Sequence, residues 1–203
     1  MNDGRAALRW SVELYTTGRA FRRAPFRPVP RVAGALRAAG VPTFERLSAP
    51  EVRMARAYAS LRVHVVWSTR HRRPWLDPEW RGRLFSVASG LAEAGRARLL
   101  CAGGVRDHLH LYLEIAATDP LQALVTTLKG GTARWIRSTF PHRAAFAWQE
   151  GWAGFSVAPG EDGALLDYIR HQEVRHRDHD FAGEYLGLLE RHGIAYDLRE
   201  VWD

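Results

Sequence analysis

The chain has 203 residues, is 46% hydrophobic and carries a formal net charge of +7, which is enough apolar material for one core and excludes a wholly disordered protein. No apolar run approaches the roughly 18 residues that span a bilayer, and the basic first thirty residues lack the apolar stretch of a secretory signal. We therefore expect a cytoplasmic protein with no membrane partner. The single cysteine, Cys101, cannot form an internal disulfide and is interpreted as a buried strand thiol.

The positive charge is concentrated in the first part of the chain. Residues 1–60 hold eleven arginines and four acidic residues, so this segment alone accounts for the net charge of +7. Its Arg- and Pro-rich stretch, "RRAPFRPVPRV", is typical of a linker or tail. We expect residues 1–53 to be a basic extension, either an overextended gene start or a loosely attached arm, and residues 54–203 to form the folded domain. A genuine N-terminal helical subdomain is the competing interpretation.

Regular patterns begin near position 60. Residues 61–68, "LRVHVVWS", alternate between an apolar side and a side that carries His64, which predicts a strand. Residues 77–96 have apolar side chains at helical spacing after an Asp-Pro start, and residues 97–105 read as a second strand.

The third predicted strand, within "GVRDHLHLYLEI", carries two histidines on one side. His108 and His110 share a face with Tyr112, and the leucines between them point the other way. A polar strand face of this kind is usually just solvated in an antiparallel sheet. The alternative is that the two imidazoles converge to bind something.

The remaining elements complete a recognisable order. A helix is predicted over 119–140, where Gly130 and Gly131 should weaken or bend it, followed by a short strand at 154–158 and helices at about 161–177 and 180–192. The order strand, helix, strand, strand, helix, strand predicts an α+β fold of the ferredoxin-like, split β-α-β type. Two helices would cover one face of the antiparallel sheet, and the histidines would lie on the other.

A phenol and an amide recur one helical turn apart in "EDGALLDYIRHQEVRH". Tyr168 and Gln172 are four residues apart and therefore share one face of the predicted helix. If that helix crosses the open sheet face, these groups meet His108 and His110. Neutral imidazoles and an amide oxygen can hold a divalent cation that polarises a phosphate for attack by a phenolate.

These residues resemble a known family, the single-tyrosine HUH transposases, which are TnpA-type enzymes of bacterial insertion sequences. His108-Leu109-His110 matches the HUH motif, and "YIRHQ" matches the family's tyrosine-and-glutamine helix. Other segments that look like the family, in family order, are "VHVVWSTRHRRPW", "LKGGTARW", "WQEGWAGFSV" and "GIAYDLREVWD". The resemblance covers essentially residues 54–203.

The resemblance implies a function and assigns residues to it. A transposase of this kind cuts single-stranded DNA at the ends of a mobile element, keeps a covalent 5′-phosphotyrosine, and rejoins the strands. Tyr168 would be the nucleophile, and His108, His110 and Gln172 would be the metal ligands, with Mg²⁺, or else Mn²⁺, as the ion. The implied partners are DNA with subterminal hairpins and a second copy of the chain in a homodimer, whose tyrosine helix can complete the other subunit's site.

Further residues are expected around the site. Asp107 is a candidate acceptor that orients a histidine ligand from behind. We expect Arg70, Arg72 and Arg73 to bind DNA phosphates, although a solvated loop is the competing interpretation. Lys129, the only lysine, is either a phosphate contact or a solvated helix charge. Trp152 replaces the tyrosine that relatives often carry, so base stacking is retained and the hydroxyl is lost.

Two other functions remain as alternatives. A domesticated relative of the same fold would grip DNA hairpins without moving an element. An RNA-binding ferredoxin-like domain would be expected to show aromatic side chains where His108 and His110 stand. The presence of all four catalytic positions favours the enzyme.

Overall fold

The computed structural model describes residues 58–177, 180–199 and 201–202, so the predicted extension over residues 1–53 lies outside the described residues. Within them, no helix combines the length and the apolar character that crossing a membrane would require. The elements, in chain order, are β1 (Leu61–Ser68), η1 (Arg70–Arg72), α3 (Pro78–Ala94), β2 (Arg98–Gly104), β3 (His108–Ile115), α4 (Leu121–Thr139), η2 (Pro141–Arg143), β4 (Ala153–Ser156), α5 (Asp162–Arg170), α6 (Gln172–Arg175) and α7 (Phe181–Arg191).

The four strands form one antiparallel sheet in the order β2-β3-β1-β4. This order, with α3 and α4 as the two crossover helices, is the ferredoxin-like plan, so the predicted fold class is confirmed. In the pairing of β1 with β3, Val66 lies opposite His110 and His64 lies opposite Tyr112. Because paired residues share a face, His64 and His110 are diagonal neighbours on the same side of the sheet.

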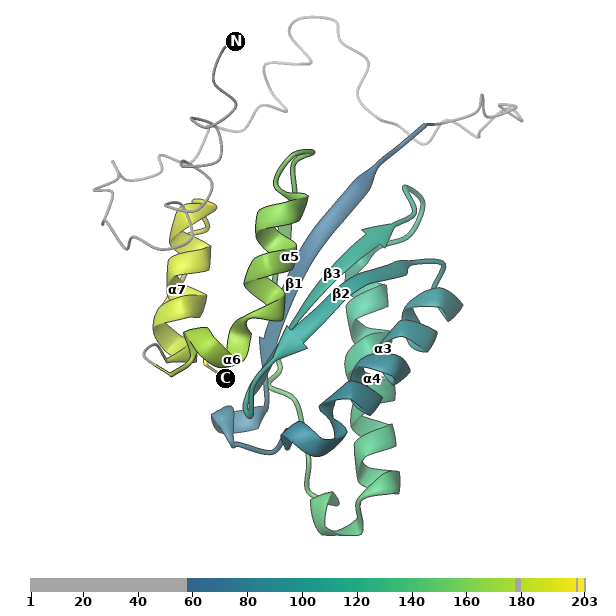
Figure 1. Cartoon of the computed structure of the whole chain (residues 1–203), viewed down its shortest axis with the longest axis vertical. Coiled ribbons are helices and arrows are strands. Elements are labelled where there is room, and N and C mark those ends of the chain that lie inside the picture. The colour runs from purple at the N-terminus through teal and green to yellow at the C-terminus, as the bar shows by residue number, and fades with distance from the viewer. Residues whose placement is uncertain (1–57, 178–179, 200, 203) are drawn as a thin grey trace, which may run out of the picture. The chain divides into compact units, whose positions relative to one another are not determined.

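One face of the sheet packs on α3 and α4, as Figure 1 shows. The leucines of β3 alternate toward these helices, and Leu109, Leu111 and Leu113 have no exposed surface. The helix α4 runs without a break from Leu121 to Thr139, through the glycine pair that was predicted to weaken or bend it. A Cβ at Gly131 would lie 2.6 Å from the Leu91 side chain, so glycine at this position allows α3 and α4 to approach closely.

The opposite face is covered by α5, α6 and α7 (Figure 1). Contacts near both of its ends hold α5 against the sheet. At its start, Asp162 accepts hydrogen bonds from the Tyr112 hydroxyl and the Arg62 guanidinium. Near its end the backbone touches β2, because a Cβ at Gly103 would lie 2.1 Å from the Ile169 carbonyl oxygen. The predicted helix over the histidine-bearing face is therefore confirmed, and a glycine sets its distance from the sheet.

The single helix predicted over residues 161–177 is two shorter helices in the structure. The helix α5 ends at Arg170, His171 leaves helical geometry with φ −100° and ψ 20°, and α6 begins at Gln172. The break does not separate the two predicted site residues, because the Gln172 side-chain amide still lies 3.4 Å from the Tyr168 carbonyl oxygen. Tyr168 and Gln172 thus stay neighbours although they belong to different helices.

Candidate active site

The two histidines of β3 are fully buried, and each is fixed by a partner behind it. His108 Nδ1 lies 2.8 Å from Asp107 Oδ1, and His110 Nδ1 lies 3.0 Å from His64 Nε2. A carboxylate can only accept from His108, so His108 carries its proton on Nδ1 and presents a lone pair on Nε2. The side-chain Nε2 of His110 is buried with no hydrogen-bond partner. The Nε2 atoms of both rings thus point away from these partners, on the same side of the strand.

Burial keeps the imidazoles of His108 and His64 neutral. Desolvation lowers the pKa of His108 below its usual value, although the hydrogen bond to Asp107 acts in the opposite direction. Burial also lowers the pKa of His64 well below its usual value, and the neighbouring His110 adds to this effect. Neutral imidazole is the form that coordinates metal ions, so the surroundings favour ligation over ionic pairing with a substrate.

The phenol of Tyr168 lies against this pair inside one chain. The Tyr168 ring stands edge-on to His110 with centroids 5.4 Å apart, and only 4% of the residue is exposed. Its hydroxyl donates a hydrogen bond to Glu184 Oε1. Burial, followed by the Glu184 charge, raises the pKa of Tyr168 well above its usual value, so the phenol is protonated at neutral pH.

Gln172, the third predicted ligand, lies beside His108 and Glu184. Its side-chain oxygen lies 3.4 Å from His108 Nε2, and its amide nitrogen lies 3.2 Å from Glu184 Oε1. The residue is 1% exposed. The structure therefore brings the predicted nucleophile and all three predicted ligands to one buried place, with every group supplied by the same chain.

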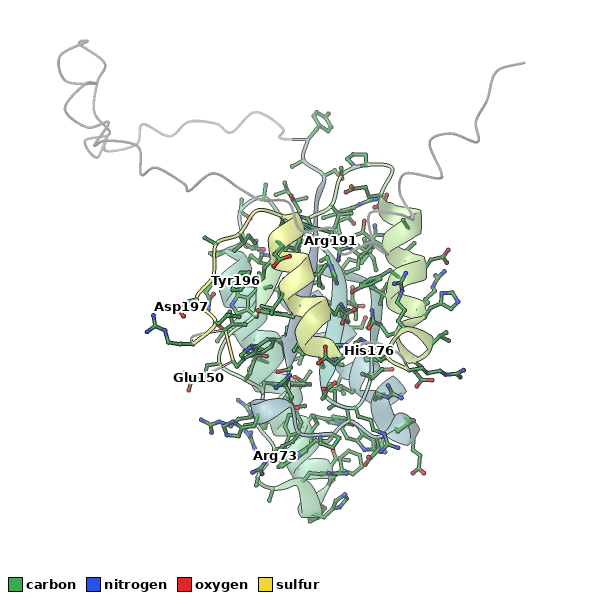
Figure 2. The ribbon with its side chains drawn as sticks, turned by 90° about the vertical axis from the view of Figure 1, so that its left-hand side faces the viewer. Arg73, Glu150, His176, Arg191, Tyr196 and Asp197 are labelled. Carbon is green, nitrogen blue, oxygen red and sulfur yellow. The ribbon has the colours of Figure 1, made fainter. Side chains whose placement is uncertain are left out.

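Two residues of the site were not identified from the sequence. From the sequence, His176 reads mainly as a cap or surface residue at the end of the tyrosine helix, with phosphate binding as the minor alternative. It lies beside the N-terminal end of α7, with its Nε2 2.9 Å from Glu184 Oε2 (Figure 2). The same carboxylate oxygen lies 3.4 Å from His110 Nε2 and 3.5 Å from His108 Nε2. One ligand atom from each of His108, His110, His176 and Glu184 lies within 4.8 Å of the others.

Glu184 is a charged group on a buried helix face. The apolar stripe of α7 is made by Phe181, Tyr185 and Leu188, and Glu184 falls on the same side at i+3 from Phe181. Burial raises the pKa of this carboxyl, but the three imidazoles together outweigh burial and hold its pKa below the usual range. A carboxylate inside an apolar stripe was the sequence signal that could have revealed it.

The arginines predicted to bind DNA lie in and just after η1, at the end of β1. Arg70, Arg72 and Arg73 are all exposed. The Arg72 guanidinium lies 5.0 Å from the centroid of the Trp202 ring, and Arg73, labelled in Figure 2, lies 6.0 Å from that of Trp75. A groove of about 490 Å³ is lined by residues that include Pro74, Asp107 and His176. The residue that follows Arg73 and one histidine of the cluster thus line the same groove.

Lys129 and Trp152 lie on the far side of the strands from this cluster. The Lys129 ammonium donates hydrogen bonds to the carbonyls of Gln149, Glu150 and Gly151, at 2.7, 2.8 and 2.9 Å. Burial lowers its pKa to about 8, with the Glu150 charge opposing. Trp152 is half-buried, and its indole nitrogen lies 3.1 Å from the Gln122 side-chain oxygen. The structure thus gives Lys129 a role in holding the loop before β4, and its predicted phosphate contact stays a prediction.

Comparisons with known proteins place these residues in context. A family model described as "Transposase IS200 like" matches residues 57–172. The transposases for insertion sequence element IS200 of Salmonella typhimurium and Salmonella typhi are each 27% identical over 144 residues, covering 68% of this chain and 91% of theirs.

Two solved structures are also similar. A putative transposase from Deinococcus radiodurans is 24% identical with a TM-score of 0.49, over 60% of this chain and 98% of its own. A REP-associated tyrosine transposase bound to a REP hairpin is 14% identical with a TM-score of 0.47, over 61% of this chain and 73% of its own.

Proposed function

The chain belongs to the family of IS200-like transposases, and we propose that it cuts and rejoins single-stranded DNA at the ends of an insertion sequence through a 5′-phosphotyrosine intermediate. The single observation that carries this proposal is the meeting of Tyr168 with His108, His110 and Gln172 at one buried place. Tyr168 supplies a hydroxyl nucleophile in that place, and imidazoles with an amide oxygen are donors for a divalent cation.

Tyr168 would attack the scissile phosphate. The phenolic oxygen forms the new bond to phosphorus, the bond from phosphorus to the 3′ oxygen breaks, and that oxygen takes up a proton from water and leaves as a hydroxyl group. Because the phenol is protonated at neutral pH, its proton must leave during attack, and it is directed at Glu184 Oε1. Rejoining would be the same exchange in reverse, with a 3′ hydroxyl displacing the tyrosine.

The donor set fits a divalent cation. In His108 and His110 the other ring nitrogen, Nδ1, contacts Asp107 and His64, respectively. The Nε2 of His110 is buried without a hydrogen-bond partner. Gln172 adds a neutral oxygen. When bound, Mg²⁺ or Mn²⁺ would supply a positive charge that polarises the phosphate and offsets the charge developing on the leaving oxygen.

The basic loop after β1 would guide the DNA strand to this place. Arg70, Arg72 and Arg73 are exposed, and guanidinium groups bind phosphate oxygens through paired hydrogen bonds. Trp75 is half-buried beside them and could stack on an unpaired base. We propose subterminal hairpins as the recognised DNA form and a homodimer as the working unit, with each phenol acting in its own chain's site.

The test is a covalent adduct. Purified full-length protein with Mn²⁺ or Mg²⁺ should form a denaturation-resistant complex with a labelled single-stranded oligonucleotide carrying the element's end. Tyr168→Phe should remove the complex, whereas Tyr185→Phe, a buried tyrosine of α7 outside the ligand set, should retain it. An adduct that survives in Tyr168→Phe would overturn the assigned nucleophile.

The same assay separates the enzyme from a domesticated hairpin-binding protein. Such a protein would bind the hairpin oligonucleotide with Arg-dependent affinity but form no adduct under any metal condition. Hairpin binding without adduct in the unaltered protein would therefore contradict the proposed activity while leaving the DNA partner in place.

A further inference from the structure

The Glu184 carboxylate contacts more partners than a single structural ion pair would need. Its side chain is 10% exposed and comes from α7, which none of the predicted ligands occupies. Its two oxygens face different partners. Oε2 contacts the Nε2 atoms of three imidazoles, and Oε1 accepts from the Tyr168 hydroxyl and the Gln172 amide.

The spacing around Oε2 matches the edges of a metal coordination shell. Oε2 lies 2.9 Å from His176 Nε2, 3.4 Å from His110 Nε2 and 3.5 Å from His108 Nε2. Donors that bind one ion at about 2.0–2.2 Å stand roughly 3.0 Å apart in an octahedral shell and roughly 3.4 Å apart in a tetrahedral one. The distances from Oε2 to the three imidazole nitrogens are therefore close to those of a shared coordination shell, and all four donor atoms lie within 4.8 Å of one another.

A buried atom without a partner supports the same conclusion. The Nε2 of His110 is buried and has no hydrogen-bond partner, although the Glu184 carboxylate lies only 3.4 Å away. Buried polar atoms in folded proteins nearly always have a partner, and an ion bound between these two groups would supply one.

We propose that Glu184, together with His176, is a ligand of the divalent ion held by His108 and His110, and that the other oxygen of the same carboxylate positions Tyr168. This proposal rests on the proposed function for the identity of the nucleophile, but its metal part does not. Glu184 is thus a metal ligand through Oε2 and a positioning residue for the phenol through Oε1. Three imidazoles and one carboxylate favour a transition ion such as Mn²⁺ over Mg²⁺.

The direct test measures metal binding rather than cleavage. Mn²⁺ affinity of the metal-stripped full chain is followed by electron paramagnetic resonance of the free ion, with Glu184→Gln as the test variant. Glu190→Gln is the matched control, because Glu190 is an exposed carboxylate on the same helix. We expect Glu184→Gln to weaken Mn²⁺ binding by at least about tenfold and Glu190→Gln to leave it unchanged. Equal affinities in the two variants would overturn the proposal.

A second measurement covers the case in which Glu184→Gln folds less well. Mn²⁺ that binds the folded chain raises its melting temperature, and the size of the rise reports affinity whatever the starting stability. We expect the rise caused by saturating Mn²⁺ in the wild type to be strongly reduced in Glu184→Gln and intact in Glu190→Gln. A full rise in Glu184→Gln would contradict a ligand role and leave only a structural one.

The two proposals fail in different ways. If the unaltered chain forms no DNA adduct while Glu184→Gln still loses Mn²⁺ affinity, the proposed function fails and the metal assignment stands. If Tyr168→Phe removes the adduct while Glu184→Gln binds Mn²⁺ as tightly as the wild type, the nucleophile stands and Glu184 is not a ligand.

Discussion

The two faces of the sheet bury the same strand for different purposes. Toward α3 and α4, β3 presents Leu109, Leu111 and Leu113, which pack against further apolar side chains of these helices. Toward α5, α6 and α7 it presents His108 and His110, and these helices place a phenol, an amide and a carboxylate beside them.

The difference shows how a small fold can separate stability from chemistry. Apolar burial contributes roughly 25 cal/mol per Å², whereas a buried polar group costs free energy unless every donor and acceptor finds a partner. On the polar face Asp107 and His64 hold the rings of the two histidines from behind, whereas the Nε2 of His110 is buried without a hydrogen-bond partner. We therefore expect changes on the apolar face to lower stability first and changes on the polar face to remove activity first.

The largest effect on stability is expected from Leu111→Ala on the apolar face. Leu111 has no exposed surface, so truncation leaves a cavity and should lower the free energy of unfolding by about 2–5 kcal/mol. Urea unfolding followed by circular dichroism measures this loss. At a temperature where the variant is folded, its DNA adduct should still form, and loss of the adduct by the folded variant would show that the two faces are not separable.

A smaller effect is expected from Gly103→Ala, which acts where the polar face is held to the sheet. The new Cβ would lie 2.1 Å from the Ile169 carbonyl oxygen, so α5 must move away. We expect a loss of about 1–3 kcal/mol in stability together with reduced adduct formation, because Tyr168 follows Ile169 outward.

Gly130→Ala is the matched control on α4, where a Cβ meets nothing within 4 Å. It should raise stability by up to about 1 kcal/mol, since alanine favours helix over glycine, and should leave the adduct unchanged. Equal effects of the two substitutions on adduct formation would argue against a fixed distance between α5 and β2.

The smallest effect on DNA binding is expected from Lys129→Met. Its ammonium is occupied by three carbonyls before β4, so removal should lower stability by about 1–2 kcal/mol and leave the salt dependence of DNA binding unchanged. Arg72→Gln, on the exposed basic loop, should do the reverse and reduce the slope of log K against log salt by about 0.7. A reduced slope in Lys129→Met would restore the phosphate contact predicted from the sequence.

Much of this arrangement could be predicted because strands alternate strictly. The period of two placed His108 and His110 on one face and the leucines on the other, and the order of elements then determined which face the crossover helices cover. The pairing of Tyr168 with Gln172 followed from helical spacing, and it persists across the break at His171.

What could not be predicted depends on contacts between distant segments. Glu184 reaches the imidazoles only because α7 packs beside α5, and no local spacing connects it with His108. Lys129 looks like a solvated or phosphate-binding charge along the sequence, and the carbonyls that it holds come twenty residues later. The resemblance to the family identified the tyrosine and the HUH pair, but it supplied neither of these partners.

The central claim is that the phenol on the polar face is the group that bonds to DNA. The most direct measurement is peptide mapping by mass spectrometry after the protein has reacted with a single-stranded oligonucleotide and Mn²⁺. We predict that the mass of a nucleotide fragment will be found on the peptide that contains Tyr168. A nucleotide attached to another residue, such as Tyr112 or Tyr185, would contradict the account.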